Sequence, residues 1–308
     1  MFFVKLRERW AFKSSLTLYE GFVIFLNEAG RGAAWERTGM GCQWSEVQIL
    51  SPRPFAVFML KILLTNDDGI NSKGIQFLRS FLEKFGLVWV VAPEGERTGI
   101  SHALSLKHPL RVKRLEDRVW AVEGTPVDCV HLAVFRLLKE RPDLVVSGPN
   151  DGPNIGDEVF YSGTVAAAIE ASILGIQAIA ISMAPRDGHN YDTAAFVLEK
   201  LIPKLLEDPL PARTALNVNV PNIPPTELKG FKVTRLAKRV FVDCIKECLD
   251  PRGVPYYWLS GGGRFSEEEG TDHEALKAGF VSVTPLKADL TAYEEFVRIS
   301  KWGLEKDL

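Results

Sequence analysis

The segment Lys61-Ile62-Leu63-Leu64-Thr65-Asn66-Asp67-Asp68-Gly69 is an apolar run that ends at two adjacent carboxylates and a glycine. A short apolar run bounded by turn residues is typical of a buried strand. In an open parallel sheet, ligands bind outside the carboxyl ends of the strands. This strand would therefore present Asp67 and Asp68 to a ligand.

Two adjacent carboxylates repel each other, and protonation, a basic partner or a cation must relieve that repulsion. A divalent metal ion held by Asp67 and Asp68 is one interpretation. An ordinary strand-to-turn junction is the other, because Asn, Asp and Gly all favour turns. The segment alone does not decide between them.

Composition narrows the class of protein. The chain has 308 residues, is 46% hydrophobic and carries a formal charge of -2, which allows a substantial core in one or two domains. The sequence has no basic stripe of the kind that binds a nucleic acid polymer, and it has no apolar stretch long enough to cross a membrane. Cys42, Cys129, Cys244 and Cys248 form neither a CxxC pair nor a disulfide scaffold, so we expect reduced thiols and a cytoplasmic protein.

Residues 1–58 differ from the rest, because their tryptophans lie among glycines and basic residues without sustained periodicity. Residues 47–54 can be back-translated to a sequence that resembles the T-arm and acceptor end of a tRNA gene. We therefore predict that 1–58 is a non-native or disordered extension and that translation begins near Met59. A genuine family-specific arm is the alternative, which N-terminal sequencing of the native protein would distinguish.

From Met59 onward, short apolar runs alternate with helical patterns. This alternation predicts βαβ units in a Rossmann-like, mostly parallel sheet with flanking helices, a three-layer α/β/α domain over residues 59–308. Strands are expected at 61–64, 87–91, 144–146, 176–182 and 216–220, a strand pair within 104–122, and helices at 72–85, from Thr125-Pro126, at 164–174 and at 191–206. Alternating turns and aromatic residues predict a hairpin arm over about residues 240–265.

Two further loops follow predicted strands and would reach the same edge of the sheet as Asp67 and Asp68. Thr98 lies in the first loop and Asn150 in the second, and their neutral oxygens suit Mg²⁺ or Mn²⁺. The Ser162-Gly163-Thr164 segment opens a helix whose free N–H groups suit a phosphate, although a plain helix cap is compatible with the same residues. His102 could contact phosphate or the leaving oxygen, or be a solvated loop histidine.

Together these features predict metal-assisted phosphoester chemistry. No GxGxxG motif follows the first strand, which argues against a dinucleotide cofactor. The carboxylates are adjacent rather than spaced as Asp-x-Asp, which argues against a phospho-aspartate intermediate of the haloacid-dehalogenase type. Either Asp67 or Asp68 could accept the proton of the attacking water.

The motifs resemble the SurE (survival protein E) family of metal-dependent 5′/3′-nucleotidases. The resemblance runs from Met59 to about Thr291 and includes Thr-Asn-Asp-Asp-Gly at 65–69, the loop at 93–99, Gly-Thr-Pro-x-Asp-Cys at 124–129, and the Ser-Gly-x-Asn-x-Gly-x-Asn-x-Gly signature at 147–156. It continues through Tyr-Ser-Gly-Thr-Val at 161–165 and the segments 250–258, 270–272 and 282–286.

The resemblance implies a role for each matching residue. One divalent metal ion per subunit would be bound by Asp67, Asp68, Thr98 and Asn150, and the phosphate would be contacted by Asn154, Ser162, Gly163 and Thr164. Thr98 stands where the family usually has Ser, which keeps the hydroxyl and stiffens the side chain.

The resemblance also implies the activity and the assembly. Substrates would be nucleoside 5′- and 3′-monophosphates, with polyphosphate as a further candidate, and the arm would join protomers into a homodimer or homotetramer. A non-catalytic, metal-dependent nucleotide or phosphate sensor on the same site is the alternative. It would bind its ligand without turnover.

Overall fold

The protein is described here by a computed structural model that covers residues 59–184, 190–241, 245–259 and 263–304, together with four strands between Leu16 and Glu46. The chain divides into two compact units, Met1–Phe58 and Met59–Leu308. The boundary coincides with the predicted start at Met59. That translation begins there stays a prediction.

The first unit contains one antiparallel sheet in the order β1-β2-β3-β4. Its strands are β1 (Leu16–Tyr19), β2 (Phe22–Leu26), β3 (Gly32–Thr38) and β4 (Gly41–Glu46). Each strand pairs with its neighbour in sequence, which is the simplest connection for an antiparallel sheet.

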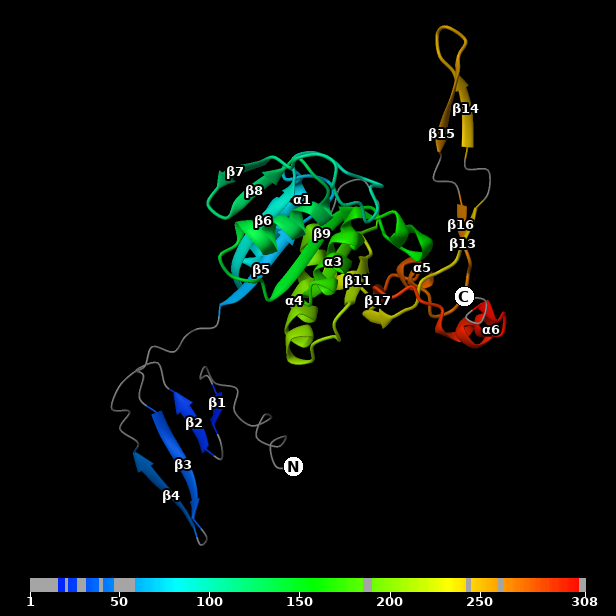
Figure 1. Cartoon of the computed structure of the whole chain (residues 1–308). Helices are drawn as coiled ribbons and strands as arrows, with labels where there is room; N and C mark the ends of the chain where they lie inside the picture. Colours follow the sequence, from blue (N-terminus) through cyan, green and yellow to red (C-terminus); the bar gives the residue numbers. More distant parts are fainter. Residues whose placement is uncertain are drawn as a thin grey trace. The chain divides into compact units, whose positions relative to one another are not determined.

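The second unit is built on a sheet with the order β12-β17-β11-β10-β9-β5-β6-β8-β7 (Figure 1). The strands are β5 (Leu60–Thr65), β6 (Gly86–Pro93), β7 (Val112–Glu116), β8 (Val119–Val122), β9 (Leu144–Asp151), β10 (Gln177–Met183), β11 (Thr214–Val220), β12 (Phe231–Val233) and β17 (Val281–Lys287). The central strands from β11 to β8 run parallel, whereas β7 and β17 pair antiparallel with their neighbours β8 and β11. The predicted Rossmann-like sheet is confirmed.

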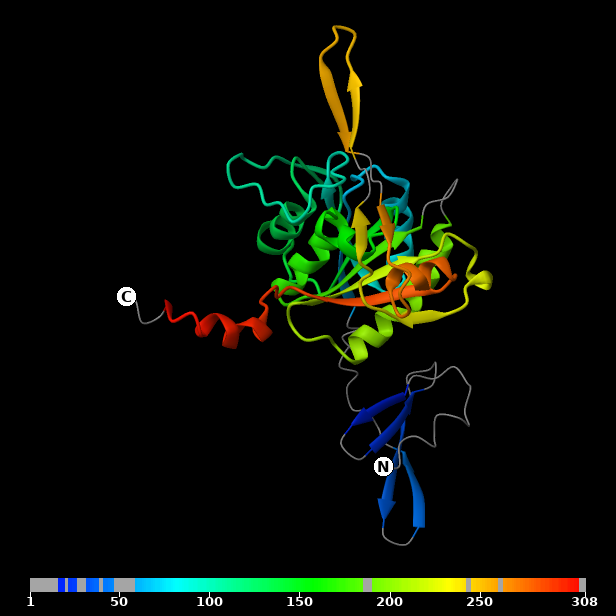
Figure 2. The same ribbon diagram turned by 90° about the vertical axis from the view of Figure 1, so that its right-hand side faces the viewer.

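Helices cover both faces of this sheet (Figures 1 and 2). They are α1 (Lys73–Leu82), α2 (Pro126–Leu132), α3 (Gly163–Ile173) and α4 (Tyr191–Glu207), followed by the shorter α5 (Asp272–Lys277) and α6 (Phe296–Ser300). Thr125 caps α2 and Pro126 opens it, as expected from the sequence. The strand pair expected within 104–122 is limited to β7 and β8.

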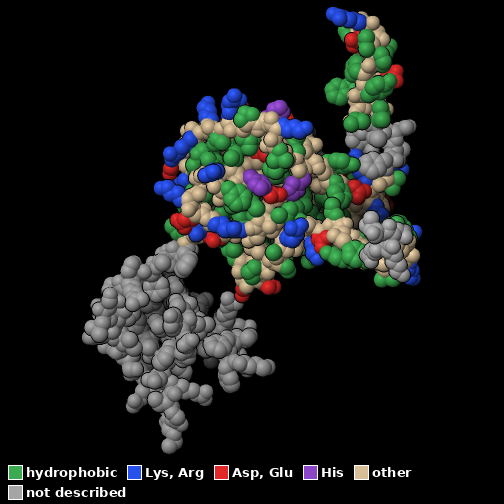
Figure 3. Space-filling view, in the orientation of Figure 1, with side chains coloured by type: hydrophobic (Ala, Val, Ile, Leu, Met, Phe, Trp, Pro, Cys, Tyr) green, Lys and Arg blue, Asp and Glu red, His purple; other side chains and the backbone are tan. Residues whose placement is uncertain are grey.

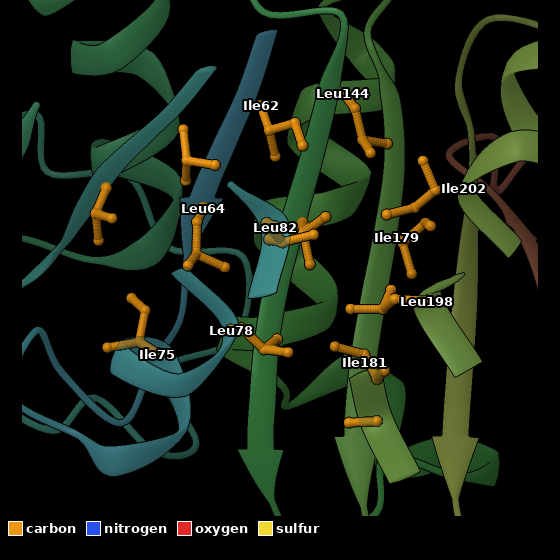
Figure 4. Close-up of a cluster of buried hydrophobic side chains, with 14 of the residues drawn as sticks. Ile62, Leu64, Ile75, Leu78, Leu82, Leu144, Ile179, Ile181, Leu198 and Ile202 are labelled. Carbon is orange, nitrogen blue, oxygen red and sulfur yellow. The ribbon is translucent and has the colours of Figure 1, made fainter. Parts of the chain in front are cut away.

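Successive side chains of a strand pack into two separate hydrophobic cores, one on each face of the sheet. On one face Ile62 and Leu64 pack with Leu78 of α1 and Leu198 of α4 (Figure 4). On the other face Leu63 belongs to a cluster with residues of α2 and α3. Because both faces are covered, the central strands are apolar at nearly every position, as parallel strands usually are. The fold is therefore the predicted three-layer α/β/α arrangement.

The strand order reverses direction at β5. The chain passes from β5 to β6 on one side, and later returns to place β9 on the other side of β5. A switch point of this kind opens a crevice at the carboxyl ends of the two strands. Here those ends carry Asp67 and Asn150.

The C-terminal arm consists of two hairpin ladders, β13 (Arg239–Phe241) with β16 (Gly263–Phe265) and β14 (Ile245–Leu249) with β15 (Pro255–Leu259). Figures 1 and 2 show that β14 and β15 extend away from the sheet. The predicted hairpin arm is confirmed. Among the described residues, no helix is both long and apolar enough to cross a membrane.

Candidate active site

The turn after β5 is fixed by the side chain of Asn66. Its Nδ2 donates to Gly69 O (3.1 Å) and to Ser72 Oγ (2.8 Å), the N-cap of α1. Gly69 has φ +95°, and a Cβ at this position would lie 3.0 Å from the backbone of Gly95. Glycine is therefore required here by both conformation and space. These contacts place Asp67 and Asp68 at the carboxyl edge of the sheet.

Asp67 is buried against the first turn of α3. Only 3% of Asp67 is exposed, and its carboxylate accepts hydrogen bonds from the Thr164 hydroxyl and from the N–H groups of Thr164 and Gly163. A Cβ on Gly163 would lie 2.9 Å from the Asp67 Cβ, so only glycine allows this approach. The helix start that was predicted to receive phosphate thus also holds the Asp67 carboxylate.

Thr164 also connects Asp67 to the end of β9. Its hydroxyl oxygen lies 3.4 Å from Asn150 Oδ1. Asn150 Nδ2 donates to Gly152 O at 2.7 Å, which fixes the amide and leaves its oxygen directed toward Thr164. Three predicted site residues, Asp67, Asn150 and Thr164, are therefore brought together.

Asp68 lies in a strongly negative environment. Burial raises its pKa to about 7, and the negative charges of Asp67, Asp151 and Glu96 act in the same direction. Burial also raises the pKa of Asp67, although the hydrogen bonds from α3 oppose that shift. Glu96 and Asp151 were not among the site residues predicted from the sequence. Their positions in the two edge loops, beside Thr98 and Asn150, were the available signal.

The loop after β6 reaches the site through the backbone of Arg97 and the side chain of Ile100. Arg97 N donates to Asp67 O at 2.7 Å, and a Cβ on Gly163 would lie 3.1 Å from Ile100 Cγ2. Thr98 is exposed, and its hydroxyl donates to Glu96 Oε1 at 2.7 Å. Thr98 therefore lies on a loop that contacts the site, with its hydroxyl hydrogen directed to Glu96 and its oxygen lone pairs still available to a cation.

Asn154 and Ser162 are held by neighbouring polar groups. Asn154 Nδ2 donates to Ser182 Oγ (2.8 Å), and its backbone N–H donates to Asn219 Oδ1 (2.8 Å). Asn217 and Asn219 in turn donate to the Asn154 carbonyl. Ser162 is the N-cap of α3, since its hydroxyl accepts from Val165 N at 3.1 Å. The predicted contacts of Asn154 and Ser162 with phosphate remain predictions.

His102 does not bond to any of the residues above. Its Nε2 lies 2.7 Å from Glu170 Oε2, farther along α3. The predicted role of His102 in phosphate binding stays a prediction, and this pairing was not foreseen because nothing in the sequence links two residues so far apart.

The site fits a hard divalent cation. Carboxylate and amide oxygens are the ligand types that Mg²⁺ and Mn²⁺ prefer, and no basic side chain is among the groups that shift the pKa of Asp67 or Asp68. The described residues contain no group of three or more His, Cys, Asp or Glu side chains arranged for a metal ion. A cation here would therefore depend on Asn150, Thr98 and water in addition to the two carboxylates.

Fold and site together define a Rossmann-like α/β protein with an acidic site at the switch point of its sheet. The family model for Survival protein SurE matches residues 62–243. A protein named 5'-nucleotidase SurE from Coxiella burnetii (strain RSA 331 / Henzerling II) is 48% identical over 244 residues, which cover 79% of this chain and 95% of the relative. The chain belongs to the SurE family.

Other comparisons agree over nearly the whole length of the relatives. The 5'-nucleotidase SurE of Pelobacter propionicus is 50% identical over 246 residues, covering 79% of this chain and 99% of the relative. The crystal structure of the SurE protein from Aquifex aeolicus matches with a TM-score of 0.71 and 42% identity, covering 79% of this chain and 99% of that one.

Proposed function

We propose that this protein is a divalent-metal-dependent phosphomonoesterase that hydrolyses nucleoside 5′-monophosphates to nucleoside and phosphate. Relatives that carry the name 5'-nucleotidase SurE align with it over 95% to 100% of their length. The observation that carries the proposal is the pair Asp67 and Asp68 at the switch point, with Asp67 hydrogen-bonded to the start of α3.

In this proposal Asp67, Asp68, Asn150 and Thr98 hold one Mg²⁺ or Mn²⁺ ion per subunit. Such an ion supplies positive charge that offsets the phosphoryl oxygens and acidifies water. The raised pKa of Asp68 supports this assignment, because after burial its next largest cause is the negative charge of Asp67 and its neighbours, which a bound cation would offset.

The two carboxylates differ in the role each can take. Asp67 is buried and accepts hydrogen bonds from the hydroxyl and N–H donors of α3, which fix its carboxylate as a metal ligand. Asp68 is only half-buried and accepts a backbone hydrogen bond from Asp151, which leaves it room to accept a proton. Asp68 therefore takes the proton of the attacking water, an assignment that residue types alone left open.

The reaction is an in-line displacement at phosphorus. The water oxygen forms a bond to phosphorus while the bond from phosphorus to the nucleoside O5′ breaks. The leaving oxygen takes up a proton from solvent, and Asp68 returns the proton that it accepted to solvent. The Ser162 hydroxyl and the second N–H of the Asn154 amide, which donates its other N–H to Ser182, orient the phosphate. These donors position the substrate, and Asp68 moves the proton.

The proposal extends to the finer properties. Nucleoside 3′-monophosphates and polyphosphate are further substrates to test, because a site for phosphate and metal discriminates weakly between leaving groups. The exposed arm joins protomers into a homodimer or homotetramer. Free Cys129 and Cys248 are consistent with a cytosolic location.

A substrate panel crossed with metals tests the proposal directly. Phosphate release from 5′- and 3′-nucleotides and polyphosphate is measured with Mg²⁺, Mn²⁺ or a chelator, using the wild type and Asp68→Ala. We expect release from 5′-nucleotides that a chelator abolishes and that Asp68→Ala reduces by at least about a thousandfold. Release that neither treatment changes would contradict the proposal, and metal-dependent binding without turnover would favour the sensor.

A further inference from the structure

Outside the site, one carboxylate lies between two imidazoles. Glu170 Oε2 is 2.7 Å from His102 Nε2, and Glu170 Oε1 is 2.7 Å from His131 Nε2. The Glu170 side chain is 11% exposed, whereas the two histidines are 37% and 34% exposed. Figure 3 shows histidine side chains beside acidic side chains near the middle of one face, among hydrophobic side chains. We call His102, Glu170 and His131 the histidine clamp.

The clamp connects three elements. Two further hydrogen bonds join the loop to the start of α2, because Thr125 Oγ1 donates to Ala103 O (2.7 Å) and Ser105 N donates to Asp128 Oδ1 (2.9 Å). His131 lies in the last turn of α2, and Glu170 lies on α3, the helix whose first turn holds Asp67. His102 lies on the loop that carries Thr98. Both oxygens of Glu170 are engaged, so each histidine limits the rotation of the carboxylate that the other contacts.

The loop with Thr98 depends on external contacts for its shape. Gly99 has φ +72°, and Ser101 has φ +57°, a left-handed conformation that is costly for a residue other than glycine. Ser101 is held from outside, because its N–H donates to Tyr161 O (2.9 Å) and its hydroxyl to Phe160 O (2.5 Å). The next residue is His102, so the clamp anchors the loop immediately after its strained position.

We propose that the histidine clamp is a positioning device that fixes the loop carrying Thr98 against α3, and so sets the affinity of the site for its metal ion. The proposal rests on the proposed function for the identity of that ion. Arg97 N anchors the start of the loop to Asp67 O, and the clamp anchors the loop at His102 to the helix that holds the Asp67 carboxylate. Thr98 lies between these two anchors.

The clamp acts on the site through the loop and not by contact with substrate. The Nε2 atom of His102 is already engaged by Glu170. Loss of groups that orient metal ligands typically lowers metal affinity by about tenfold to a hundredfold. We therefore expect the same range for the loss of the clamp, with a smaller change in kcat at saturating metal.

The test uses the full-length protein and three variants. Glu170→Ala removes both contacts, and His102→Gln retains a donor on the loop. His108→Ala is the matched control, because His108 is an exposed histidine of the same loop with no hydrogen bond or ion pair within the described residues. Mn²⁺ affinity is measured by electron paramagnetic resonance of the free ion, and loop mobility by amide hydrogen exchange over residues 97–105.

We expect Glu170→Ala to weaken Mn²⁺ binding about tenfold and to speed exchange in the loop by a similar factor. His102→Gln should fall between Glu170→Ala and the wild type, and His108→Ala should match the wild type. A folded Glu170→Ala variant with wild-type affinity and exchange overturns the proposal. If Glu170→Ala does not fold, His102→Ala gives the same two readouts at a more exposed position.

The two proposals fail in different ways. A wild type that binds Mn²⁺ but releases no phosphate contradicts the proposed function alone, and the affinity and exchange of the variants still decide the role of the clamp. A wild type that binds no Mn²⁺ overturns both. Faster exchange together with unchanged Mn²⁺ affinity shows a purely structural clamp and overturns the positioning role.

Discussion

The carboxyl edge of the sheet and the C-terminal arm differ in which side chains they expose to solvent. At the edge, the polar Asp67 is 3% exposed and is surrounded by donors from α3. On the arm, the apolar Trp258 and Leu259 are 62% and 82% exposed. Figure 3 shows that hydrophobic side chains cover much of the arm.

A buried carboxylate and an exposed apolar patch each cost free energy unless they have suitable partners. A buried carboxylate needs hydrogen bonds or an opposite charge, and an exposed apolar patch needs a partner surface. At the edge, Thr164 and Gly163 of the same chain donate hydrogen bonds to the Asp67 carboxylate. The apolar side chains of the described arm are not covered by other described parts of the chain. Substitutions at the edge should therefore change chemistry, and substitutions on the arm should change assembly.

Gly163→Ala should have the largest effect, because it disturbs the edge at its closest contact. The new methyl would lie 2.9 Å from the Asp67 Cβ and must displace it. A displacement of this kind costs about a hundredfold in rate, measured as kcat/KM for nucleotide hydrolysis. Gly95→Ala is the control, since its methyl would meet nothing within 4 Å; an equal loss in both variants would contradict the steric explanation.

Thr164→Val should lower kcat/KM by removing one hydrogen bond to Asp67 without changing the shape of the site. The substitution removes the hydroxyl that donates to Asp67 and leaves a buried acceptor with fewer donors. Loss of a hydrogen bond to a charged group costs about 1.5–3 kcal/mol, which corresponds to roughly a tenfold to hundredfold loss in kcat/KM. Thr164→Ser keeps the hydroxyl and should retain most of the activity, and a Ser variant as impaired as Val would refute the role of this bond.

The double substitution Trp258→Ser with Leu259→Ser should dissociate the oligomer and leave the fold intact. Exposed side chains contribute little to the monomer, so its free energy of unfolding should change by less than about 0.5 kcal/mol. Light scattering after size-exclusion chromatography measures the mass. Val233→Ser, at a body position that is 83% exposed, should leave the mass unchanged, and a wild type that is already monomeric would contradict the proposed assembly.

The architecture of the second unit was predictable because local patterns determine it. Apolar runs such as 61–64 become buried strands, and Thr125 with Pro126 opens α2 in the expected way. The edge location of Asp67 and Asn150 followed from their positions at strand ends. These features depend on period and spacing, which a single sequence contains.

The partners of the site residues were not predictable in the same way. That α3 caps the Asp67 carboxylate, and that His102 faces Glu170, depends on how loops fold over the sheet. Such contacts join residues that are distant in sequence, and no local periodicity records them. The charges of Glu96 and Asp151 near Asp68 were missed although both residues lie beside predicted ligands, because sequence position does not show which side chains of a loop face the site.

The smallest expected effect is a pH dependence of stability at the histidine clamp. Hydrogen bonds from His102 and then His131, opposed by burial, hold the pKa of Glu170 below its ordinary value of 4.5. A carboxyl whose pKa is lowered by folding stabilises the protein above its unfolded-state pKa, and this contribution is lost as pH falls through the folded-state pKa. Glu170→Gln, which cannot ionise, lacks the contribution at every pH.

The free energy of unfolding should therefore differ most between the wild type and Glu170→Gln near neutral pH, and the difference should shrink as the pH falls below about 4. Urea titrations across this range measure it. Glu123→Gln is the control, because Glu123 pairs with Arg111 at the surface, where an ion pair contributes little. A difference for Glu170→Gln that stays constant down to low pH would show that the variant acts through packing, because a loss of packing contacts does not depend on the ionisation of Glu170.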